Sequence, residues 1–334
     1  MKRYTITIAT PLFPPDIGGP ALYAEMFSRM WSQEGHDVSV VSFGSLKKFP
    51  TGLRHILYLF KLLPALIKAD VVYALDTFSV ALPVVVLGHI LRKKVIVRVG
   101  GDFLWETYMH RTEEPVLLSD FYNEERPLTF KENTIFDLTN FIFQYADLVV
   151  FSTQWQKDIF LKSYSLDAQK VLVIENAFPS RAQRNIVPKN RIILSPSRDI
   201  FLKNKKGLEK AFAIVKERFF DPVLDVSVSS RDTLLSRMSE AYMVVVPSFS
   251  EVSPNMVLDA VSLGVPVVAT EDCGIKDRFS DVVVWVNPKD PQSIASGIEL
   301  LMDAKTYSEY MARMSKFAYT RSEKDVATDF LNLI

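Results

Sequence analysis

This 334-residue sequence has a single cysteine and no excess of charge of either sign, and each of these absences excludes a class of protein. The single cysteine, Cys273, excludes an intramolecular disulfide and fits a reducing compartment. Lys and Arg total 39, and so do Asp and Glu, which leaves none of the basic excess that nucleic-acid-binding proteins usually carry. We therefore expect a cytoplasmic protein that does not bind nucleic acid.

Patterns that hold metals or common cofactors are missing as well. The four histidines are scattered, and none has a second ligand at a useful spacing. No Gly-x-Gly-x-x-Gly is followed about 20 residues later by an acidic residue, as an NAD-dependent oxidoreductase would require. No Gly-Lys-Ser or Gly-Lys-Thr marks a P-loop. We therefore expect neither a bound metal nor a resident cofactor.

Long hydrophobic runs are also absent. The longest nearly uncharged stretch, 78–91, contains Pro83 and His89 and is too short and too interrupted to span a bilayer. The N-terminus alternates like a strand and lacks a signal-peptide cleavage site. The segment LRHILYLFKLLPALIK, residues 53–68, has two interpretations. We favour a half-buried helix, and the alternative is a helix resting on an anionic membrane surface.

What the sequence does contain is a repeated alternation of short β-rich runs and helical segments, which is typical of parallel sheets covered by helices. In the first half, strands are expected at 5–9, 37–43, 71–74, 95–99, 148–152 and 171–174. Helices are expected at 20–33, 53–68, 80–91, 134–145 and 155–162. The stretch 106–127 is polar and aromatic and predicts an irregular working loop.

A second α/β pattern begins near Arg191. Strands are expected at 192–195, 223–228, 243–246, 267–269 and 282–286, with helices at 206–218, 232–240 and 255–263. The segment 178–190 is the best linker candidate, and Ser322 with Asp325 predicts the capping box of a last helix. We expect an N-terminal domain at 1–180, a second domain at 187–312, and a helical segment at 313–334 that crosses back to the first domain.

Two glycines follow the first expected strand. Gly18 and Gly19 let the backbone approach an anion, and the helix that starts at Pro20 offers free N–H groups. The alternative is an ordinary tight turn between strand and helix.

A group of cations follows the first strand of the second domain. Arg198, Lys203, Lys205 and Lys206 lie where a diphosphate would meet the edge of the sheet, and a guanidinium can bind it bidentately. The alternative is a solvated charge run. We favour a functional role for Arg198, which is nearest the end of the strand.

The most specific feature is a pair of acids eight positions apart, Glu251 and Asp259. The first is expected in a loop after a buried strand, and the second one turn into a helix. Carboxylates at these places suit sugar and ribose hydroxyls. Ser253 is expected to cap the helix, with Pro254 at its first position.

These features, in this order, resemble glycosyltransferase family 4, whose members have the GT-B fold. That family has a Gly-Gly turn, an Arg followed five positions later by Lys, two Glu eight apart, and a Gly-x-Pro-Val turn. The corresponding residues here are Gly18-Gly19, Arg198 with Lys203, Glu251 with Asp259, and Gly264-Val265-Pro266-Val267. The resemblance covers nearly the whole chain and implies two Rossmann-like domains facing a cleft.

The resemblance also implies an activity and roles for residues. The activity is a retaining, metal-independent transfer of a sugar, of hexosyltransferase type, from a nucleotide-diphosphate donor to a glycan or lipid-linked acceptor. No Asp-x-Asp is present, the usual carboxylate pair for a donor-bound metal in metal-dependent glycosyltransferases. The residues implied in donor binding are Gly18, Gly19, Arg198, Lys203, Lys206, Glu251, Ser253, Asn255, Met256 and Asp259. Those implied in catalysis are Glu251, Arg198, Lys203 and, from the first domain, Asp102.

The sequence departs from the family pattern at several positions. The second acid is Asp259 rather than Glu, Asn204 stands where the family usually has Gly, and Lys206-Gly207 offers a competing alignment to Lys203. Many relatives have a His after the fourth strand, where this chain has Gly-Gly-Asp102, and a turn-forming Asp is the alternative for that residue. The shortened second acid also leaves open a catalytically silent protein that binds nucleotide sugars.

The second domain is also short. Only 23 residues separate Phe219 from Met243, whereas a full strand–helix–strand crossover needs about 30. We therefore predict five parallel strands, one strand–helix unit fewer than usual. Residues 228–231 would then occupy the place of the nucleotide base, in a shallow pocket whose base selectivity rests on few contacts.

Overall fold

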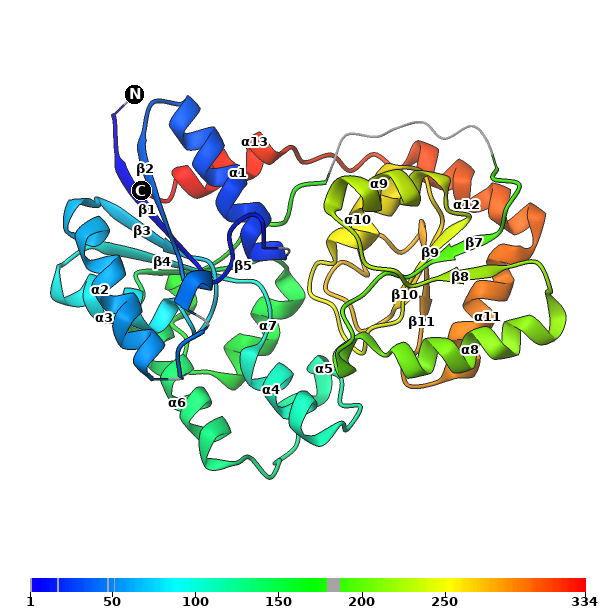
Figure 1. Ribbon diagram of the computed structural model, residues 1–334, viewed down its shortest axis with the longest axis horizontal. Helices are drawn as coiled ribbons and strands as arrows, with labels where there is room; N and C mark the ends of the chain where they lie inside the picture. The colour runs from blue at the N-terminus through cyan, green and yellow to red at the C-terminus, as the bar shows by residue number, and fades with distance from the viewer. Residues whose placement is uncertain (1, 17, 47, 51, 179–186) are drawn as a thin grey trace. The chain divides into compact units, whose positions relative to one another are not determined.

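The computed structural model describes residues 2–16, 18–46, 48–50, 52–178 and 187–334, which form two compact units (Figure 1). Unit 1 comprises Met1–Thr107, Arg126–Asn176 and Glu323–Ile334, and unit 2 comprises Tyr108–Glu125 and Ala177–Ser322. This division differs from the expected boundaries mainly in Tyr108–Glu125, which belongs to unit 2. Residues 179–186 of the expected linker lie outside the described residues.

Unit 1 contains a parallel six-stranded sheet with the order β2-β1-β3-β4-β5-β6. Its strands are β1 (Thr5–Thr10), β2 (Asp37–Ser42), β3 (Val71–Ala74), β4 (Lys94–Val99), β5 (Leu148–Phe151) and β6 (Val171–Val173). The strand order turns back between β1 and β3, with Ile6 aligned with Val38 on one side and with Val71 on the other. Such a switch point at the carboxyl edge is where doubly wound sheets bind ligands.

Helices cover the two faces of this sheet unequally. The helices are α1 (Gly19–Gln33), α2 (Leu53–Lys68), α3 (Ala81–Ile90), α6 (Phe130–Tyr145), α7 (Gln154–Ser163) and α13 (Glu323–Leu331). All crossovers except the one from β1 to β2 run in the same direction along the sheet, so right-handed connections place α2, α3, α6 and α7 on one face. The crossover through α1 leads to the opposite face.

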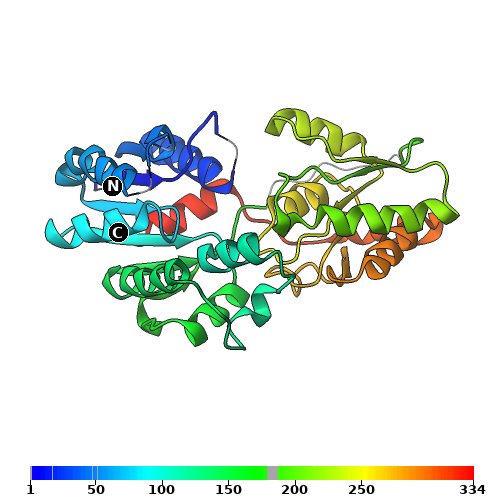
Figure 2. The ribbon, with the colours of Figure 1, turned by 60° about the horizontal axis from the view of Figure 1, so that its bottom comes forward.

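The C-terminal helix α13 completes the face that α1 alone would leave partly open. It lies beside α1 in both views (Figure 2). Trp31 Nε1 donates to the Ala327 carbonyl at 3.0 Å, and Tyr73 Oη donates to the Phe330 carbonyl at 2.6 Å. Phe330 is fully buried. A segment from the end of the chain therefore belongs to the core of unit 1.

Unit 2 contains the predicted sheet of five parallel strands, in the order β11-β10-β9-β7-β8. Its strands are β7 (Ile192–Leu194), β8 (Val223–Asp225), β9 (Met243–Val246), β10 (Val267–Thr270) and β11 (Val283–Val286). The chain from β8 through a single helix to β9 leaves β8 at the edge of the sheet. The prediction of a domain one strand–helix unit short is confirmed.

Alternating strand residues divide the core of unit 2 into two layers, because successive side chains point to opposite faces. The helices are α8 (Lys205–Arg218), α9 (Arg231–Glu240), α10 (Asn255–Ser262), α11 (Pro291–Met302) and α12 (Ala304–Lys316). Ile193 and Val245 pack with residues of α8 and α11, whereas Leu194 and Val244 pack with residues of α9 and α10. The two layers hold the carboxyl ends of β7 to β10 at one edge.

The stretch expected to be an irregular loop, 106–127, is helical over half of its residues. These belong to α4 (Phe103–Thr112) and α5 (Leu118–Phe121). Tyr108 of α4 and Phe121 of α5 are buried, so these two aromatic residues of the stretch serve packing. Among the described residues, no helix has the length and apolar character needed to cross a membrane.

Candidate functional site

Lys203 and Glu251, 48 residues apart in the sequence, lie together in unit 2. Lys203 Nζ donates to Glu251 Oε1 at 2.6 Å, and both side chains are largely shielded from solvent, with 28% and 15% exposed. Each residue follows a neighbouring strand of the sheet, β7 for the lysine and β9 for the acid. The structure therefore brings together the cation and the acid that the sequence singled out.

Asn204 fixes the position of Lys203. Lys203 ends a 3₁₀ turn (Phe201–Lys203), and Asn204 follows in the left-handed region with φ of 51°. Asparagine tolerates that conformation, which accounts for its place where the family usually has glycine. Its buried Nδ2 donates to the carbonyls of Pro247 and Pro288, at 3.0 and 2.6 Å. One amide thus ties the lysine turn to the start of the loop that carries Glu251.

The loop that carries Glu251 is held through its backbone. The Phe249 N–H donates to the Leu202 carbonyl, and the Glu251 N–H donates to the Asp272 carbonyl, both at 3.0 Å. The Glu251 carbonyl in turn accepts from the Gly274 N–H at 2.9 Å. The carboxylate is therefore presented from a backbone that leaves it little freedom to move.

The N-terminus of α10 follows this loop directly. Pro254 is the N-cap residue, and no side chain caps the helix, so the expectations that Ser253 caps it and that Pro254 is its first residue are both wrong. Because proline cannot donate, the first free N–H groups are those of Asn255 and Met256, which are half-buried. An uncapped helix N-terminus is suited to an anion, and this one begins four residues after Glu251, the partner of Lys203.

Asp259, expected to accept from ribose hydroxyls, is already paired. Arg231 Nη1 and Nη2 donate to its Oδ2 and Oδ1 at 2.9 and 3.0 Å. Only 4% of the Asp259 side chain is exposed, against 38% of Arg231. Burial raises the pKa of Asp259, and the hydrogen bonds from Arg231 act in the opposite direction. Nothing in the sequence pointed to this arginine beyond its place in the stretch 228–231.

The remaining predicted cations lie in solvent. Arg198 and Lys206 are exposed, and Lys205 Nζ lies 3.8 Å from an Asp199 carboxylate oxygen. Lys206 projects from the first turn of α8, whereas Lys203 precedes the helix and contacts Glu251. The structure thus separates the two lysines that compete in the alignment.

In unit 1, Gly18 is the N-cap residue of α1, with no side-chain cap, and Gly19 has open space around it, since a Cβ there would meet no atom within 4 Å. Asp102 is 2% exposed, and its Oδ1 accepts from the Trp105 N–H at 3.0 Å at the start of α4. This is the turn-forming role that the sequence left as the alternative.

A further contact in unit 2 joins α5 to the Glu251 loop. Ser250 Oγ donates to Asp272 Oδ2 and accepts from the Leu118 N–H at 2.8 Å, and the Ser119 N–H lies 3.4 Å from the same carboxylate oxygen. Burial raises the pKa of Asp272, and hydrogen bonds from Ser119 and Ser250 oppose this. Sequence reasoning missed Asp272 because nothing near it in the sequence indicates this contact.

The described residues contain no group of three or more His, Cys, Asp or Glu side chains placed to hold a metal ion. Charged residues that the sequence singled out in unit 2 instead form two ion pairs, Lys203 with Glu251 and Asp259 with Arg231, both after strands that end at the same edge of the sheet. They suit a ligand with both an anionic part and hydroxyl groups.

Comparisons with known proteins agree with this chemistry. Residues 226–321 match the family described as glycosyl transferases group 1. An uncharacterized glycosyltransferase of Methanocaldococcus jannaschii is 33% identical over 87 residues, which cover 25% of this chain and 22% of the relative. The O-antigen chain mannosyltransferase RfbU of Salmonella typhimurium is 25% identical over 185 residues, covering 47% of this chain and 52% of the relative. The matches thus span about half or less of these curated relatives.

Solved structures match over almost the full length of the chain. WaaG, a glycosyltransferase involved in lipopolysaccharide biosynthesis, superposes with a TM-score of 0.72 at 13% identity, covering 98% of this chain and 99% of that one. Anabaena HepE, solved in complex with UDP-glucose, gives a TM-score of 0.67 at 16% identity, covering 99% and 100%. The likeness shows the GT-B fold, and the sequence matches support the group 1 glycosyltransferase superfamily.

Proposed function

We propose that this protein is a retaining, metal-independent glycosyltransferase of family 4, which transfers a hexosyl group from a nucleotide-diphosphate sugar to a glycan or lipid-linked acceptor. The observation that carries the proposal is the Lys203–Glu251 pair, whose acid lies on the loop that leads directly into the uncapped N-terminus of α10. A cation, a carboxylate and free N–H groups together match the diphosphate and the hydroxyls of such a donor.

When a donor binds, Lys203 and Glu251 part from each other and contact different parts of it. The diphosphate competes for Lys203 and also recruits Arg198, which is free in solvent to turn toward it. Glu251, released from the lysine, accepts hydrogen bonds from the sugar or faces its developing positive charge. The bond between the anomeric carbon and the diphosphate oxygen breaks, the acceptor hydroxyl oxygen bonds to that carbon, and the hydroxyl proton passes to the leaving diphosphate. The cations stabilise the leaving charge most strongly in the transition state.

The proposal assigns no metal to this step. Arg198, Lys203 and the N–H groups of α10 supply the positive charge that a divalent ion provides in other transferases. The Gly18–Gly19 backbone offers a further anion contact from unit 1. We retain Asp102 as a candidate for contact with the sugar or acceptor, although its Oδ1 already accepts from Trp105.

A lipid-linked acceptor is supported by the outer face of α2. Tyr58, Leu62 and Leu66 face the core and are fully buried, as expected for a half-buried helix. The opposite face exposes an apolar stripe, whose members Leu53, Ile56, Phe60 and Ile67 are 47 to 69% exposed. Exposed Lys61 and Lys68 lie on the same helix. We propose a peripheral, cytoplasmic association with an anionic membrane through this stripe. The protein should co-sediment with anionic vesicles, and Phe60→Glu should weaken this binding. Co-sedimentation of Phe60→Glu at the level of the wild type would contradict the proposal.

The function is tested first by binding. A ligand that binds the native state raises its thermal stability, so UDP-, GDP- and ADP-sugars should be compared by the shift in melting temperature. With the best donor, Arg198→Ala and Lys203→Ala should each reduce kcat/KM by an amount equivalent to about 2–4 kcal/mol. Lys206→Ala, on the exposed first turn of α8, is the matched control and should change little.

Metal dependence is tested in the same assay. Transfer should continue in excess EDTA, and loss that magnesium or manganese restores would refute the metal-free mechanism. If Lys206→Ala is the damaging substitution, the assignment of the phosphate-binding lysine is wrong.

The second candidate is a catalytically silent protein that binds nucleotide sugars. It is favoured by Asp259, whose carboxylate is occupied by Arg231 rather than open to a ribose. Mass spectrometry of the product mixture decides between the two. Saturable donor binding with neither hydrolysis nor transfer would establish the silent protein.

A further inference from the structure

The Arg231–Asp259 pair changes what unit 2 offers to a nucleoside, and the inference drawn from it rests on the proposed function. Both carboxylate oxygens of Asp259 accept from the guanidinium, in a bidentate geometry with distances of 2.9 and 3.0 Å. The carboxylate side chain is almost fully buried. Each carboxylate oxygen keeps a second lone pair, but only 4% of the side chain is exposed, so a ribose hydroxyl could reach Asp259 only if Arg231 moved away and left the buried carboxylate without its partner.

Arg231 has donors to spare. A guanidinium carries five N–H groups, and two of them are used on Asp259. The residues that the structure describes supply no other hydrogen-bond partner to this side chain, and 38% of it is exposed. The remaining N–H groups are therefore available to a ligand.

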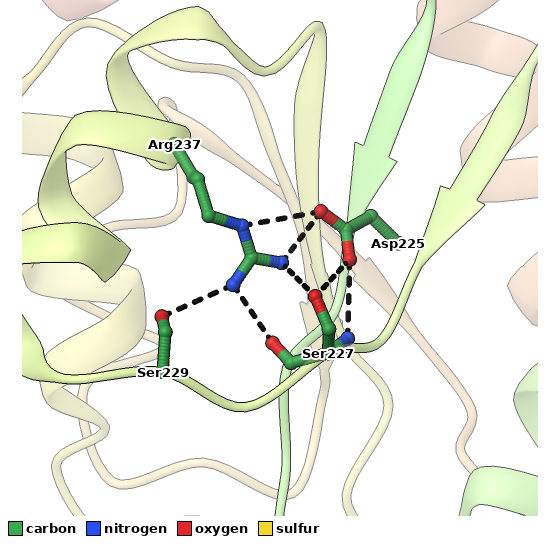
Figure 3. Close-up of polar contacts among 4 residues, drawn as sticks. All are labelled: Asp225, Ser227, Ser229 and Arg237. Atoms are coloured by element: carbon green, nitrogen blue, oxygen red, sulfur yellow. Dashed lines mark hydrogen bonds and ion pairs between the residues drawn. The ribbon is translucent and has the colours of Figure 1, made fainter.

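A network of hydrogen bonds among Asp225, Ser227, Ser229 and Arg237 holds the loop before Arg231 (Figure 3). Arg237 donates to Asp225 Oδ2, to the Ser227 carbonyl and Oγ, and to Ser229 Oγ, at distances from 2.5 to 3.2 Å. Asp225 Oδ1 accepts from the N–H and Oγ of Ser227. Ser230 then caps α9 by accepting from the Thr233 N–H. These bonds hold the chain that leads directly to Arg231.

The position of the pair along α10 indicates which part of the donor it meets. Asp259 lies four residues beyond Asn255, or about 6 Å along the helix axis from the N-terminus proposed to bind the diphosphate. That distance is the step from a diphosphate to its nucleoside. The pair also follows β8 and β9, on the same edge of the sheet as Lys203 and Glu251.

We propose that Arg231, and not Asp259, is the residue of unit 2 that meets the nucleoside of the donor. The arginine presents N–H donors and therefore selects oxygen acceptors, namely the ribose oxygens or a base carbonyl. Asp259 is a positioning residue that holds the guanidinium in a single orientation. Donor selection in this protein thus depends on a cation where the family resemblance implies an acid.

Nucleoside diphosphates without the sugar provide the direct test on the full chain. The affinities of UDP, GDP and ADP are measured by calorimetry for the wild type, Arg231→Lys, Asp259→Asn, and the double variant Arg231→Met/Asp259→Leu. The double variant removes both charges together, so it leaves no buried unpaired carboxylate and should stay folded. Arg313→Ala is the matched control, because Arg313 forms a pair with Glu309 in which both side chains are about half exposed.

We expect the double variant to weaken binding of the preferred diphosphate at least tenfold, while its melting temperature without ligand stays close to that of the wild type. The affinity of Arg231→Lys should lie between those of the wild type and the double variant, because a lysine keeps the positive charge but lacks the planar set of guanidinium N–H donors. In turnover assays the KM for the donor should rise with the Kd while kcat changes less than threefold. Asp259→Asn should weaken binding less than the double variant does.

Two results would overturn the inference. One is a double variant that binds as tightly as the wild type. The other is an Asp259→Asn variant that loses as much affinity as the double variant while Arg231→Lys loses none, which would mean that the carboxylate itself binds the ribose. If no nucleoside diphosphate stabilises the wild type, the proposed function fails and this inference with it. Binding that depends on Lys203 but not on Arg231 overturns only the inference.

Discussion

At the scale of single residues, Asn204 combines a backbone requirement with a side-chain function. Its φ of 51° is most accessible to glycine and costs asparagine less than most other residues, while its amide bridges two carbonyls. Asn204→Ala should lower the free energy of unfolding by about 2–4 kcal/mol, because it adds backbone strain to the loss of two buried hydrogen bonds.

Asn204→Gly separates the two contributions. It keeps the left-handed conformation and loses only the hydrogen bonds, so it should cost about 1–2 kcal/mol in urea denaturation. Equal losses for the alanine and glycine variants would show that strain plays no part at this position. Gly207 must stay unchanged in these variants, because a Cβ there would lie 2.4 Å from Asn204 Oδ1 and would displace the amide.

Asp225 provides a pH-dependent prediction at the same scale. Burial alone would raise its pKa, but hydrogen bonds from Ser227 and Arg237 outweigh that effect and lower it. A carboxyl with a lowered folded-state pKa contributes stability above its unfolded pKa and loses it as the pH falls through the folded value. Asp225→Asn should therefore destabilise the protein by about 1–2 kcal/mol at pH 7.

The difference between wild type and Asp225→Asn should shrink as the pH falls below about 4, where the wild-type carboxyl becomes protonated. Unfolding in urea at pH 7, 5 and 3 measures it. A difference that does not change across this range would mean that the charge of Asp225 contributes nothing to the loop.

The candidate site was predictable only where chemistry and spacing act locally. Lys203 and Glu251 were identified from the sequence by spacing, the lysine five positions after Arg198 and the acid eight positions before Asp259, in a pattern that resembles glycosyltransferase family 4. The partner of Asp259 could not be found in this way, because the pairing depends on how α9 and α10 pack. The role of Asp102 could not be decided from the sequence, because one Asp in a turn suits both a helix cap and a sugar contact.

At the scale of elements, strands were more predictable than the segments between them. The strands at Val71–Ala74 and Met243–Val246 have the predicted bounds, because continuous apolar runs of this length leave little ambiguity. The helix α4 was not predicted, because its polar and aromatic residues resemble a loop in composition. Its aromatic side chains become informative only when the surface they pack against is known.

Gly297 tests how closely α11 packs on the unit 2 sheet. A Cβ at this position would lie 2.6 Å from Val286 Cγ1 and 3.0 Å from Val268 Cγ1. Alanine is the better helix former, yet Gly297→Ala should destabilise unit 2 by about 1–3 kcal/mol, because the strands must shift to admit the methyl group.

The matched control for Gly297 is one residue earlier in α11. Ser296 is exposed, and Ser296→Ala should be neutral or slightly stabilising through helix propensity alone. Thermal denaturation of both variants makes the comparison. A Gly297→Ala variant as stable as Ser296→Ala would show that the sheet has room that the distances do not indicate.

At the scale of the whole molecule, the order of the strands explains why the chain returns to unit 1. Right-handed crossovers leave α1 alone on one face of the six-stranded sheet, and the aromatic side chains of that face need cover. Phe27 and Tyr73 pack against Phe330 of α13, with ring centroids 4.9 and 6.0 Å apart. The sequence predicted the last helix and its return, but not which aromatic residues it covers.

This arrangement predicts that one substitution near the end of the chain destabilises unit 1 selectively. Phe330→Ala removes a fully buried ring from the face shared by α1 and β3, and should cost unit 1 about 3–5 kcal/mol. The control is Glu323→Gln in the same helix, which breaks an ion pair with Arg29 whose side chains are more than half exposed. Such a pair contributes at most about 1 kcal/mol, so this variant should unfold like the wild type.

Hydrogen exchange should show faster opening in β1, β3 and α1 of Phe330→Ala and unchanged protection in β9 and β10 of unit 2. Equal acceleration in both units would mean that they unfold as one body, and no acceleration in either would mean that α13 is not part of the core of unit 1.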